Sequence, residues 1–346
     1  MPARTHDDRQ KKKIKLESWT LDHLIIMDAL ILAAGEGTRL LPLTRTRPKT
    51  LFPILNRPLL EITLDYLSHF SIQRVILNTH HLADQIDTYI HSLKKSGFHE
   101  LATRYEPIIL NTGGGLVNTR DFFRSDPFMV ISGDILTDID LKKAVDFHLS
   151  HSDPVTLVLH DYPEFNQIKV DSNGRILKLR KGDVHGLDFA NIQILDQAVF
   201  KFLPSSGSFD IIPVYQQLID QGTPIWAYIS KGHYWWNIGT PKTYLKVHED
   251  LLTETSVLKN SFPPPPLFNK GGLAGVLVHP QASVEKGVEF SGWACIGKGC
   301  LLKKGCRIHN SVLWEEVTVE SGVFVTESIL GQGVHLKDDL HEGVLI

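Results

Sequence analysis

The chain has 346 residues, of which 42% are hydrophobic and 22% charged. This composition is typical of a soluble globular protein of about two domains and excludes a largely disordered chain. The net charge of -3 gives no basis for a nucleic-acid partner, and no stretch reaches the roughly 18 apolar residues of a membrane span, so we expect neither nucleic acid nor membrane as a partner.

Residues 1–26 stand apart from the rest. They contain the basic run RQKKKIK, but no long apolar segment follows it, as a signal peptide would require. Met27 comes immediately before the first apolar run. We therefore expect residues 1–26 to be a disordered basic extension, or to follow an upstream start codon that is not used; an anchor to an anionic surface is the alternative.

The first chemical motif follows a strand. Leu30 to Leu32 form an apolar run typical of a strand buried in a parallel sheet, and Gly35, Glu36 and Gly37 come directly after it. A glycine-rich loop there can bring backbone N–H groups close to an anion. Several cations follow: Arg39, Arg45, Arg47 and Lys49. The loop favours polyphosphate binding, with a plain tight turn as the alternative. Neither the dinucleotide-binding nor the P-loop fingerprint fits.

This stretch resembles the opening motif of the sugar-1-phosphate nucleotidyltransferases, closest to the mannose-1-phosphate guanylyltransferase-like branch. The matching residues are Gly35, Gly37, Thr38, Arg39, Pro42, Leu43, Thr44, Pro48 and Lys49; Thr50 replaces the more usual proline. The resemblance implies a Rossmann-like, mostly parallel α/β sheet. It also implies nucleotide contacts from Leu32, Ala33, Gly35, Glu36, Gly37, Thr38 and Arg39, with Arg39 and Lys49 catalytic.

Helical and strand patterns then alternate. Leu60, Leu64 and Leu67 share one helical face, residues 75–77 read as a strand, and residues 82–93 carry a second apolar helical face. This alternation predicts parallel strands joined by helices. We expect His80 and His81 to be helix-start residues rather than ligands.

Three glycines, Gly113 to Gly115, mark the next motif. We expect them ahead of a helix, where a flat surface could face them, a flexible turn being the alternative. In the family the equivalent loop carries the nucleobase. The resemblance therefore assigns Asn111, Thr112, Gly113 and Gly114 to the nucleotide.

The strand Met129 to Ile131 ends at Gly133 and Asp134. A carboxylate at this edge of a sheet is suited to hold Mg²⁺, so Asp134 is the predicted metal ligand and a catalytic residue. We expect Asp138 and Asp140 to form a polar turn and a helix cap.

A strand at 155–159 and a hairpin around Asn173 and Gly174 follow. Beyond the hairpin, Lys181 lies where the family places a sugar-phosphate contact; the local match is weak, and a solvated surface lysine is the alternative. Asn191 lies in the predicted sugar site, at a position where the family commonly has glycine.

The segment YWWNIGTP resembles the family pattern W-x-D-I-G-T-P, with Asn237 in place of the acid. An amide oxygen is still a hard neutral ligand for Mg²⁺. We expect Asn237 to be the second metal ligand, with weaker metal affinity than an aspartate would give.

Residues 259–272 contain four consecutive prolines and form the predicted Pro/Gly linker after a nucleotidyltransferase domain at 27–258. Beyond it, apolar residues recur every six positions with small or turn residues between them. We expect a short hexapeptide-repeat, left-handed parallel β-helix of three to four coils over 273–346. Because so short a stack cannot bury its ends, it should pack on the first domain or form a homo-oligomer.

The three cysteines, Cys295, Cys300 and Cys306, match no common zinc spacing. We expect them to be reduced and buried in a cytoplasmic protein, a redox or metal role being the alternative.

The reaction implied by the resemblance is NTP plus sugar 1-phosphate giving NDP-sugar plus pyrophosphate, with Mg²⁺ as cofactor. GTP and mannose 1-phosphate are favoured; uridylyl or thymidylyl transfer to glucose, N-acetylmuramate or heptose 1-phosphate is the alternative. A catalytically silent regulatory subunit is a second hypothesis. A third is an acyltransferase in the β-helix, for which His279, His309 and His335 would be the candidates, although each reads as a surface residue.

Overall fold

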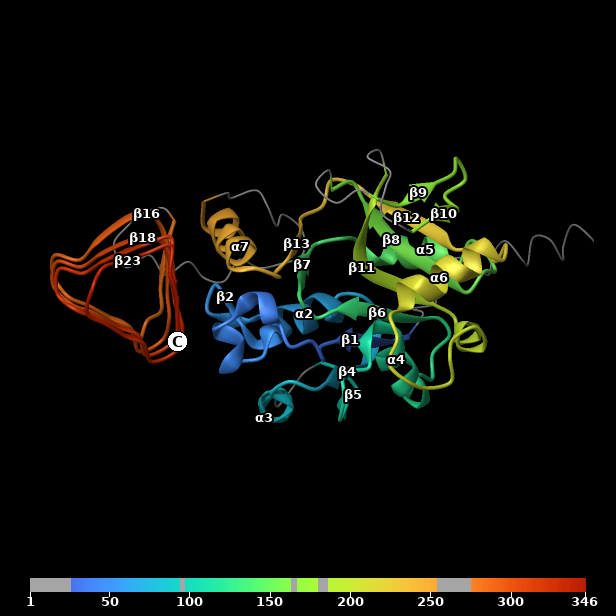
Figure 1. Cartoon of the computed structure of the whole chain (residues 1–346), viewed down its shortest axis with the longest axis horizontal. Helices are drawn as coiled ribbons and strands as arrows, with labels where there is room; N and C mark the ends of the chain where they lie inside the picture. Colours follow the sequence, from blue (N-terminus) through green and yellow to red (C-terminus); the bar gives the residue numbers. More distant parts are fainter. Residues whose placement is uncertain (1–25, 94–96, 163–166, 180–185, 254–274) are drawn as a thin grey trace, which may run out of the picture.

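The computed structural model describes residues 26–93, 97–162, 167–179, 186–253 and 275–346. An α/β part is built around a central sheet, and a C-terminal stack of parallel strands lies beside it, with α7 (Pro241–Thr253) between the two (Figure 1). Lys181, the predicted linker and residues 1–25 of the predicted extension lie outside the described residues.

The central sheet has seven strands in the order β12-β8-β11-β6-β1-β4-β5. Its pairs are parallel, except that β11 is antiparallel to both β6 and β8. The predicted mostly parallel α/β sheet is therefore confirmed. The strands are β1 (Met27–Leu32), β4 (Ile72–Thr79), β5 (Glu100–Tyr105), β6 (Phe128–Ser132), β8 (Val155–His160), β11 (Asp188–Leu195) and β12 (Trp226–Ser230).

Helices cover both faces of this sheet because alternate strand residues are apolar on each side. Ile31 and Met129 pack with helices on one face, whereas Leu30 and Val130 pack with helices on the other. On the first face lie α2 (Leu59–Ser68), α3 (Ala83–Ser92) and α5 (Leu141–His148); on the second lie α4 (Asn111–Asn118) and α6 (Ile211–Asp220). The predicted cap is confirmed, since Asp140 accepts a hydrogen bond from the backbone N–H of Lys143.

Short elements connect the layers. The 3₁₀ helices are η1 (Thr38–Leu40), η2 (Leu43–Arg45), η3 (Lys49–Leu51), η4 (Arg120–Phe122) and η5 (Gln197–Lys201). Three small antiparallel pairs are β2 (Pro53–Ile54) with β3 (Arg57–Pro58), β7 (Ile135–Thr137) with β13 (Trp235–Asn237), and β9 (Lys169–Val170) with β10 (Ile176–Lys178). The last pair is the predicted hairpin around Gly174.

The C-terminal stack consists of parallel strands arranged in three rows, and Figure 1 shows its triangular outline. Val276 pairs with Ala294 and Ala294 with Ser311, so a turn takes up 17 or 18 residues, as three hexapeptides would. This pattern is consistent with the predicted β-helix. The strands are β14 (Val276–Val278), β15 (Ser283–Val284), β16 (Glu289–Ile296), β17 (Leu301–Leu302), β18 (Arg307–Leu313), β19 (Thr318–Val319), β20 (Phe324–Thr326), β21 (Ile329–Leu330), β22 (His335–Leu336), β23 (Leu340–His341) and β24 (Val344–Leu345).

The interior of the stack is formed by apolar residues that recur every six positions, as the periodicity predicts. Ile296, Leu302 and Ile308 are completely buried, but the side chain of Val284 is 39% exposed. Val284 lies in the first turn, where β15 is paired only with β17. Val284 pairs with the completely buried Leu302 and therefore faces the same side of its row, as predicted; among the described residues, a turn covers it on one side only, and this explains its exposure.

The three cysteines are buried and free, as predicted. Burial raises the pKa of Cys300 and of Cys306 to about 11, and it also raises the pKa of Cys295. Thiols of this kind stay protonated at neutral pH.

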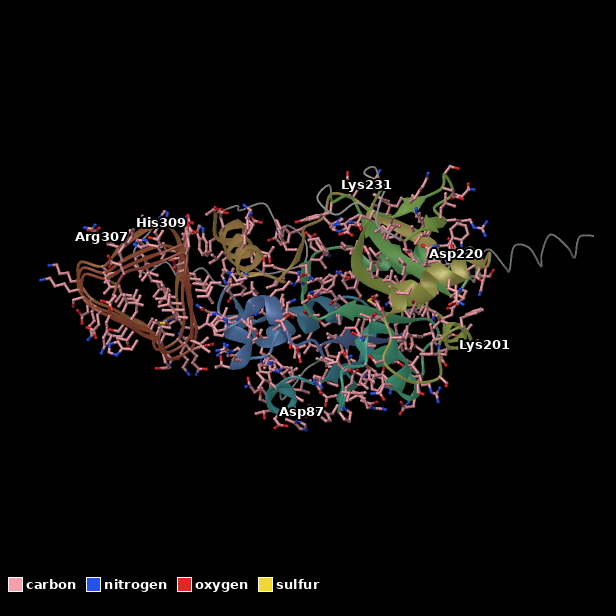
Figure 2. The ribbon with its side chains drawn as sticks, viewed as in Figure 1. Asp87, Lys201, Asp220, Lys231, Arg307 and His309 are labelled. Carbon is pink, nitrogen blue, oxygen red and sulfur yellow. The ribbon has the colours of Figure 1, made fainter. Side chains whose placement is uncertain are left out.

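The stack packs on the first domain through one of its sides. Leu277, Cys295, Val312 and Ile329 occupy equivalent positions in successive turns and join a hydrophobic cluster with residues of the first domain. Figure 2 shows Arg307 and His309 projecting from a different part of the stack. We call Leu277, Cys295, Val312 and Ile329, together with Trp293 and Trp314 of the same cluster, the docking face. The predicted packing on the first domain is confirmed.

Candidate functional site

A cavity of about 390 Å³ lies at the carboxyl ends of β1 and β6, the edge at which open α/β sheets bind ligands. Residues from the first loop, from the start of α4 and from the end of β6 surround it. They are Leu32, Ala33, Ala34, Gly35, Gly37, Thr38, Arg39, Lys49, Thr50, Asn78, Ile109, Asn111, Thr112, Ser132, Asp134 and Asp210. The structure thus brings most of the predicted nucleotide and catalytic residues together.

The glycines of the first loop have different roles. A Cβ at Gly35 would meet nothing within 4 Å, so this position leaves open space beside the cavity. Gly37 has a φ of +64°, and a Cβ there would lie 2.8 Å from Cγ2 of Thr44. Thr44 also donates its hydroxyl to the carbonyl oxygen of Gly37. Gly37 is therefore required by the turn itself.

Lys49 and Asp134 form an ion pair in the cavity wall, through Nζ and Oδ2. The hydroxyl of Ser132 donates to Oδ1 of Asp134 at 2.6 Å. Burial disfavours the charged carboxylate, but the nearby Lys49 ammonium and hydrogen bonds from Ser132 and Asn237 outweigh it, so the pKa of Asp134 is lowered. The carboxylate is ionised at neutral pH and available as an oxygen ligand.

Asn237 lies beside Asp134, although it does not line the cavity. It belongs to β13, opposite Ile135, and the next residue, Ile238, donates its backbone N–H to the carbonyl oxygen of Asp134 at 2.8 Å. A Cβ on Gly239 would lie 2.5 Å from Oδ1 of Asn237 and 3.0 Å from Nη2 of Arg39. Glycine at 239 therefore lets the amide and the guanidinium approach this edge of the site.

The three consecutive glycines lie within α4, and the expectation that they precede the helix is wrong. A Cβ on Gly113 would lie 2.2 Å from the ring of Phe209, and one on Gly114 would lie 2.3 Å from the carbonyl oxygen of Gly207. The backbone N–H groups of Gly113 and Gly114 both donate to the carbonyl oxygen of Phe209. These glycines allow a loop to pack directly on the helix.

Asn111 and Thr112, by contrast, line the cavity. Asn111 has a φ of +59° and donates from its amide to the hydroxyl of Ser208. Thr112 donates its hydroxyl to Oδ1 of Asp210 at 2.8 Å, and Asp210 also caps α6. Asp210 is not among the predicted site residues, although its position directly before the apolar run of α6 is a typical helix-start signal.

A second missed group is a buried pair behind the first loop. Asn78 accepts a hydrogen bond from the backbone N–H of Ala33 and donates to Oε1 of Glu106, both at 2.8 Å. Glu106 is fully buried and accepts from the backbone N–H of Leu110 through its other oxygen. This network ties the first loop to the start of α4. The sequence signal for this pair is the position of each residue, since Asn78 lies at the end of β4 and Glu106 directly follows the adjacent strand β5.

The remaining predicted residues lie away from the cavity or outside the described part of the chain. Glu36 is exposed, and Asn191 is partly buried on β11 with a φ of +58°. This left-handed conformation explains why glycine suits the position, and asparagine tolerates it better than most residues. Lys181 is outside the described residues. His80 and His81 precede α3, as predicted, and their rings bond backbone carbonyl oxygens.

A glycine-rich loop, a lysine–aspartate pair and a cavity at the carboxyl edge of a mostly parallel sheet are typical of the class of α/β proteins that bind phosphate groups. Comparison with known families narrows this class. Residues 28–254 match the nucleotidyl transferase family, and residues 273–341 match the GMPPB C-terminal domain. The chain therefore belongs to the nucleotidyl transferase family, which confirms the predicted class of enzyme.

Two curated relatives cover most of the chain. A UTP–glucose-1-phosphate uridylyltransferase of Synechocystis is 28% identical over 91% of this chain and 87% of its own length. A mannose-1-phosphate guanylyltransferase of Mycobacterium tuberculosis is 30% identical over 86% of this chain and 83% of its own. By their names, both relatives transfer a nucleotide to a sugar 1-phosphate.

Solved structures agree on the fold of the first domain. HddC from Yersinia pseudotuberculosis, in complex with GMP-PN, has a TM-score of 0.54 at 25% identity and covers 64% of this chain and 98% of its own. A putative glucose-1-phosphate thymidylyltransferase of Bacillus anthracis has a TM-score of 0.57 at 22% identity and covers 64% of this chain and 93% of its own. Among the residues described, no helix has the length and apolarity to cross a bilayer.

Proposed function

We propose that this protein catalyses the reaction of an NTP with a sugar 1-phosphate to give an NDP-sugar and pyrophosphate. The observation that carries the proposal is the Lys49–Asp134 pair in the wall of a cavity of about 390 Å³ that a glycine-rich loop also lines. The cavity offers the cations Arg39 and Lys49 together with the ionised carboxylate of Asp134. This combination suits a triphosphate.

The favoured substrates are GTP and mannose 1-phosphate. Support comes from the match of residues 273–341 to the GMPPB C-terminal domain and from several relatives named as mannose-1-phosphate guanylyltransferases. Uridylyl transfer to glucose 1-phosphate is the second candidate, because the uridylyltransferase of Synechocystis covers 91% of the chain.

The side chains have separate roles in this proposal. Arg39 stabilises the departing β- and γ-phosphates, and Lys49 holds the α-phosphate or the attacking sugar phosphate. Asn111 and Thr112 contact the nucleoside. The sugar phosphate attacks the α-phosphate of the NTP directly, so the site needs only to align these two anions and neutralise their charge. No covalent nucleophile is required.

The residues near Asp134 fit a magnesium ion. The Asp134 carboxylate and the Asn237 amide are oxygen donors, and Mg²⁺ is commonly held by one or two protein ligands together with substrate phosphates. Among the residues described, no cluster of three or more His, Cys, Asp or Glu side chains could hold a metal by itself. Asp134 and Asn237 would hold Mg²⁺, which when bound would neutralise phosphate charge.

A matrix of four NTPs against several sugar 1-phosphates, read as pyrophosphate release by the purified full-length chain, tests the proposal. We expect the highest kcat/KM with GTP and mannose 1-phosphate. A preference for UTP and glucose 1-phosphate would select the second candidate. No pyrophosphate release from any pair would favour a silent regulatory subunit instead.

A further inference from the structure

The loop that carries Lys49 consists of short 3₁₀ helices rather than a regular element. η1, η2 and η3 span most of residues 38–51 and are held internally by hydrogen bonds between residues three apart. The hydrogen bonds of short 3₁₀ helices have poor geometry, so they hold the loop in place only weakly. The position of Lys49 therefore depends on what the loop packs against.

The C-terminal stack contacts this loop through Arg47, two residues before Lys49. The guanidinium donates to both carboxylate oxygens of Glu315, at 3.1 and 2.8 Å, and to the side chain of Gln332 at 3.0 Å. It also lies over the ring of Trp314, with Cζ 4.6 Å from the ring centroid. A bidentate pair stacked on an aromatic ring fixes both the position and the plane of a guanidinium.

Trp314 also holds the other end of the loop. Its ring meets that of Phe52 edge-on, with centroids 4.8 Å apart. Its indole N–H donates to the hydroxyl of Tyr244, which in turn donates to the carbonyl oxygen of Pro53. Contacts from one residue of the stack therefore flank Lys49 on both sides along the chain.

We propose that Glu315 and Trp314 of the C-terminal stack are positioning residues that set the place of the Lys49 ammonium in the site, acting through Arg47 and Phe52. The expected change in kcat rests on the proposed function, whereas the positioning of the loop by the stack does not. Pro48 lies between Arg47 and Lys49, and its fixed φ limits how far the loop can absorb a shift of Arg47. A displaced Arg47 therefore moves Lys49 relative to Asp134.

A displaced Lys49 should slow the chemical step more than it weakens binding of the NTP. Small misplacements of a charged group that acts on the transition state can cost up to about 10²-fold in rate. We expect Glu315→Gln in the full-length chain to lower kcat by roughly tenfold or more, while KM for the NTP changes by less than about threefold. Amide hydrogen exchange in peptides covering residues 38–52 should become faster.

Glu320→Gln is the matched control. Glu320 is also a glutamate of the stack in an ion pair, but its partners Lys303 and His335 belong to the stack itself. We expect it to leave kcat and exchange in the loop unchanged. Should Glu315→Gln fail to fold, Arg47→Lys tests the same contact, since it keeps the charge and removes the bidentate geometry.

Unchanged kcat and unchanged exchange in the loop in the Glu315→Gln variant, or in Arg47→Lys if that variant is needed, would overturn the inference. Equal losses in Glu315→Gln and Glu320→Gln would overturn it too. If the wild-type chain releases no pyrophosphate, the proposed function fails, and hydrogen exchange in the loop still decides whether the stack positions it.

Discussion

At the scale of single residues, the site depends on charges held in place before a substrate binds. Lys49 is 12% exposed and Asp134 22% exposed, so their ion pair is only partly screened by water. Ser132 and Asn237 complete the surroundings of the carboxylate. A cation fixed in this way needs little reorganisation when phosphate charge develops.

Replacing Lys49 by alanine should lower kcat by about 10²- to 10³-fold, as the loss of one preorganised oxyanion donor does. Pyrophosphate release at saturating substrates measures the change. Lys143→Ala is the control, because Lys143 is 70% exposed and pairs with Asp140, and neither residue lines the cavity. Near wild-type turnover of the Lys49→Ala variant would remove Lys49 from the mechanism.

Gly35, Arg39, Lys49 and Asp134 were predicted from the sequence, and all four line the cavity. Gly35 and Asp134 follow readable strands at the edge where ligands bind, whereas Arg39 and Lys49 were predicted from the resemblance to the family motif. Glu106 was not predicted, since nothing in the sequence shows that this carboxylate is fully buried and turned toward Asn78. Burial of a charged residue depends on partners distant in the chain, which a local pattern does not contain.

At the scale of secondary-structure elements, α4 shows how packing can override propensity. Glycine is a poor helix former, yet three glycines lie in succession within this helix. Two of these glycines are explained by the loop at Gly207 and Phe209, because side chains at positions 113 and 114 would overlap this loop. The sequence pattern could not distinguish a glycine loop ahead of a helix from glycines inside it, because that difference is decided by this distant loop.

Gly114→Ala should destabilise the protein. The better helix propensity of alanine contributes up to about 1 kcal/mol, but overpacking against a backbone oxygen costs about 1–3 kcal/mol. The Cβ would lie 2.3 Å from the carbonyl oxygen of Gly207, and a backbone group cannot turn away. Urea unfolding should show a lower midpoint than Asn118→Ala on the same helix; a raised midpoint would contradict the expectation.

The contact between α7 and the loop before β3 should depend on pH through His248. This side chain is fully buried; it accepts from the N–H of Leu55 through Nε2 and bonds the carbonyl oxygen of Tyr244 through Nδ1. Burial lowers the pKa of His248 to about 4 from 6.5. Its contribution to stability is therefore complete above pH 6.5 and is lost as the pH falls toward 4.

Between these pH values, the free energy of unfolding should fall by up to about 1.4 kcal/mol per pH unit on account of His248. Urea titrations from pH 7.5 to pH 5 measure the slope. His248→Gln should be less stable at neutral pH but show a smaller slope than the wild type. The exposed His69, replaced by glutamine, serves as control; equal slopes in the wild type and the His248 variant would contradict the prediction.

At the scale of the whole molecule, the stack and the α/β domain share one hydrophobic cluster. Phe52, Tyr244 and Trp314 meet there, and Trp314 is almost completely buried. Hexapeptide periodicity predicted the stack and its packing on the first domain. It could not predict which side docks, because Arg47 and Glu315 are separated by 268 residues and their pairing depends on the relative orientation of the two parts.

Trp314→Ala should destabilise the protein by about 3–5 kcal/mol, the usual cost of truncating a large buried aromatic residue. Trp314→Phe should cost less, because it keeps an aromatic surface against Phe52 and loses the hydrogen bond to Tyr244. Urea unfolding followed by circular dichroism gives both values. Trp226→Ala, on the partly exposed edge strand β12, is the control; a similar cost for Trp226 and Trp314 would contradict the importance of the docking face.

All three cysteines of the chain belong to the C-terminal stack, and none belongs to the α/β domain. Burial raises the pKa of Cys300 and Cys306 to about 11, so both thiols are protonated at neutral pH. Alkylating reagents should therefore react only when the stack opens. Cys295, in the docking face, would report separation of the two parts, while the other two thiols would report unwinding of the turns. The molecule thus carries native chemical labels with which the lifetime of each opening can be timed.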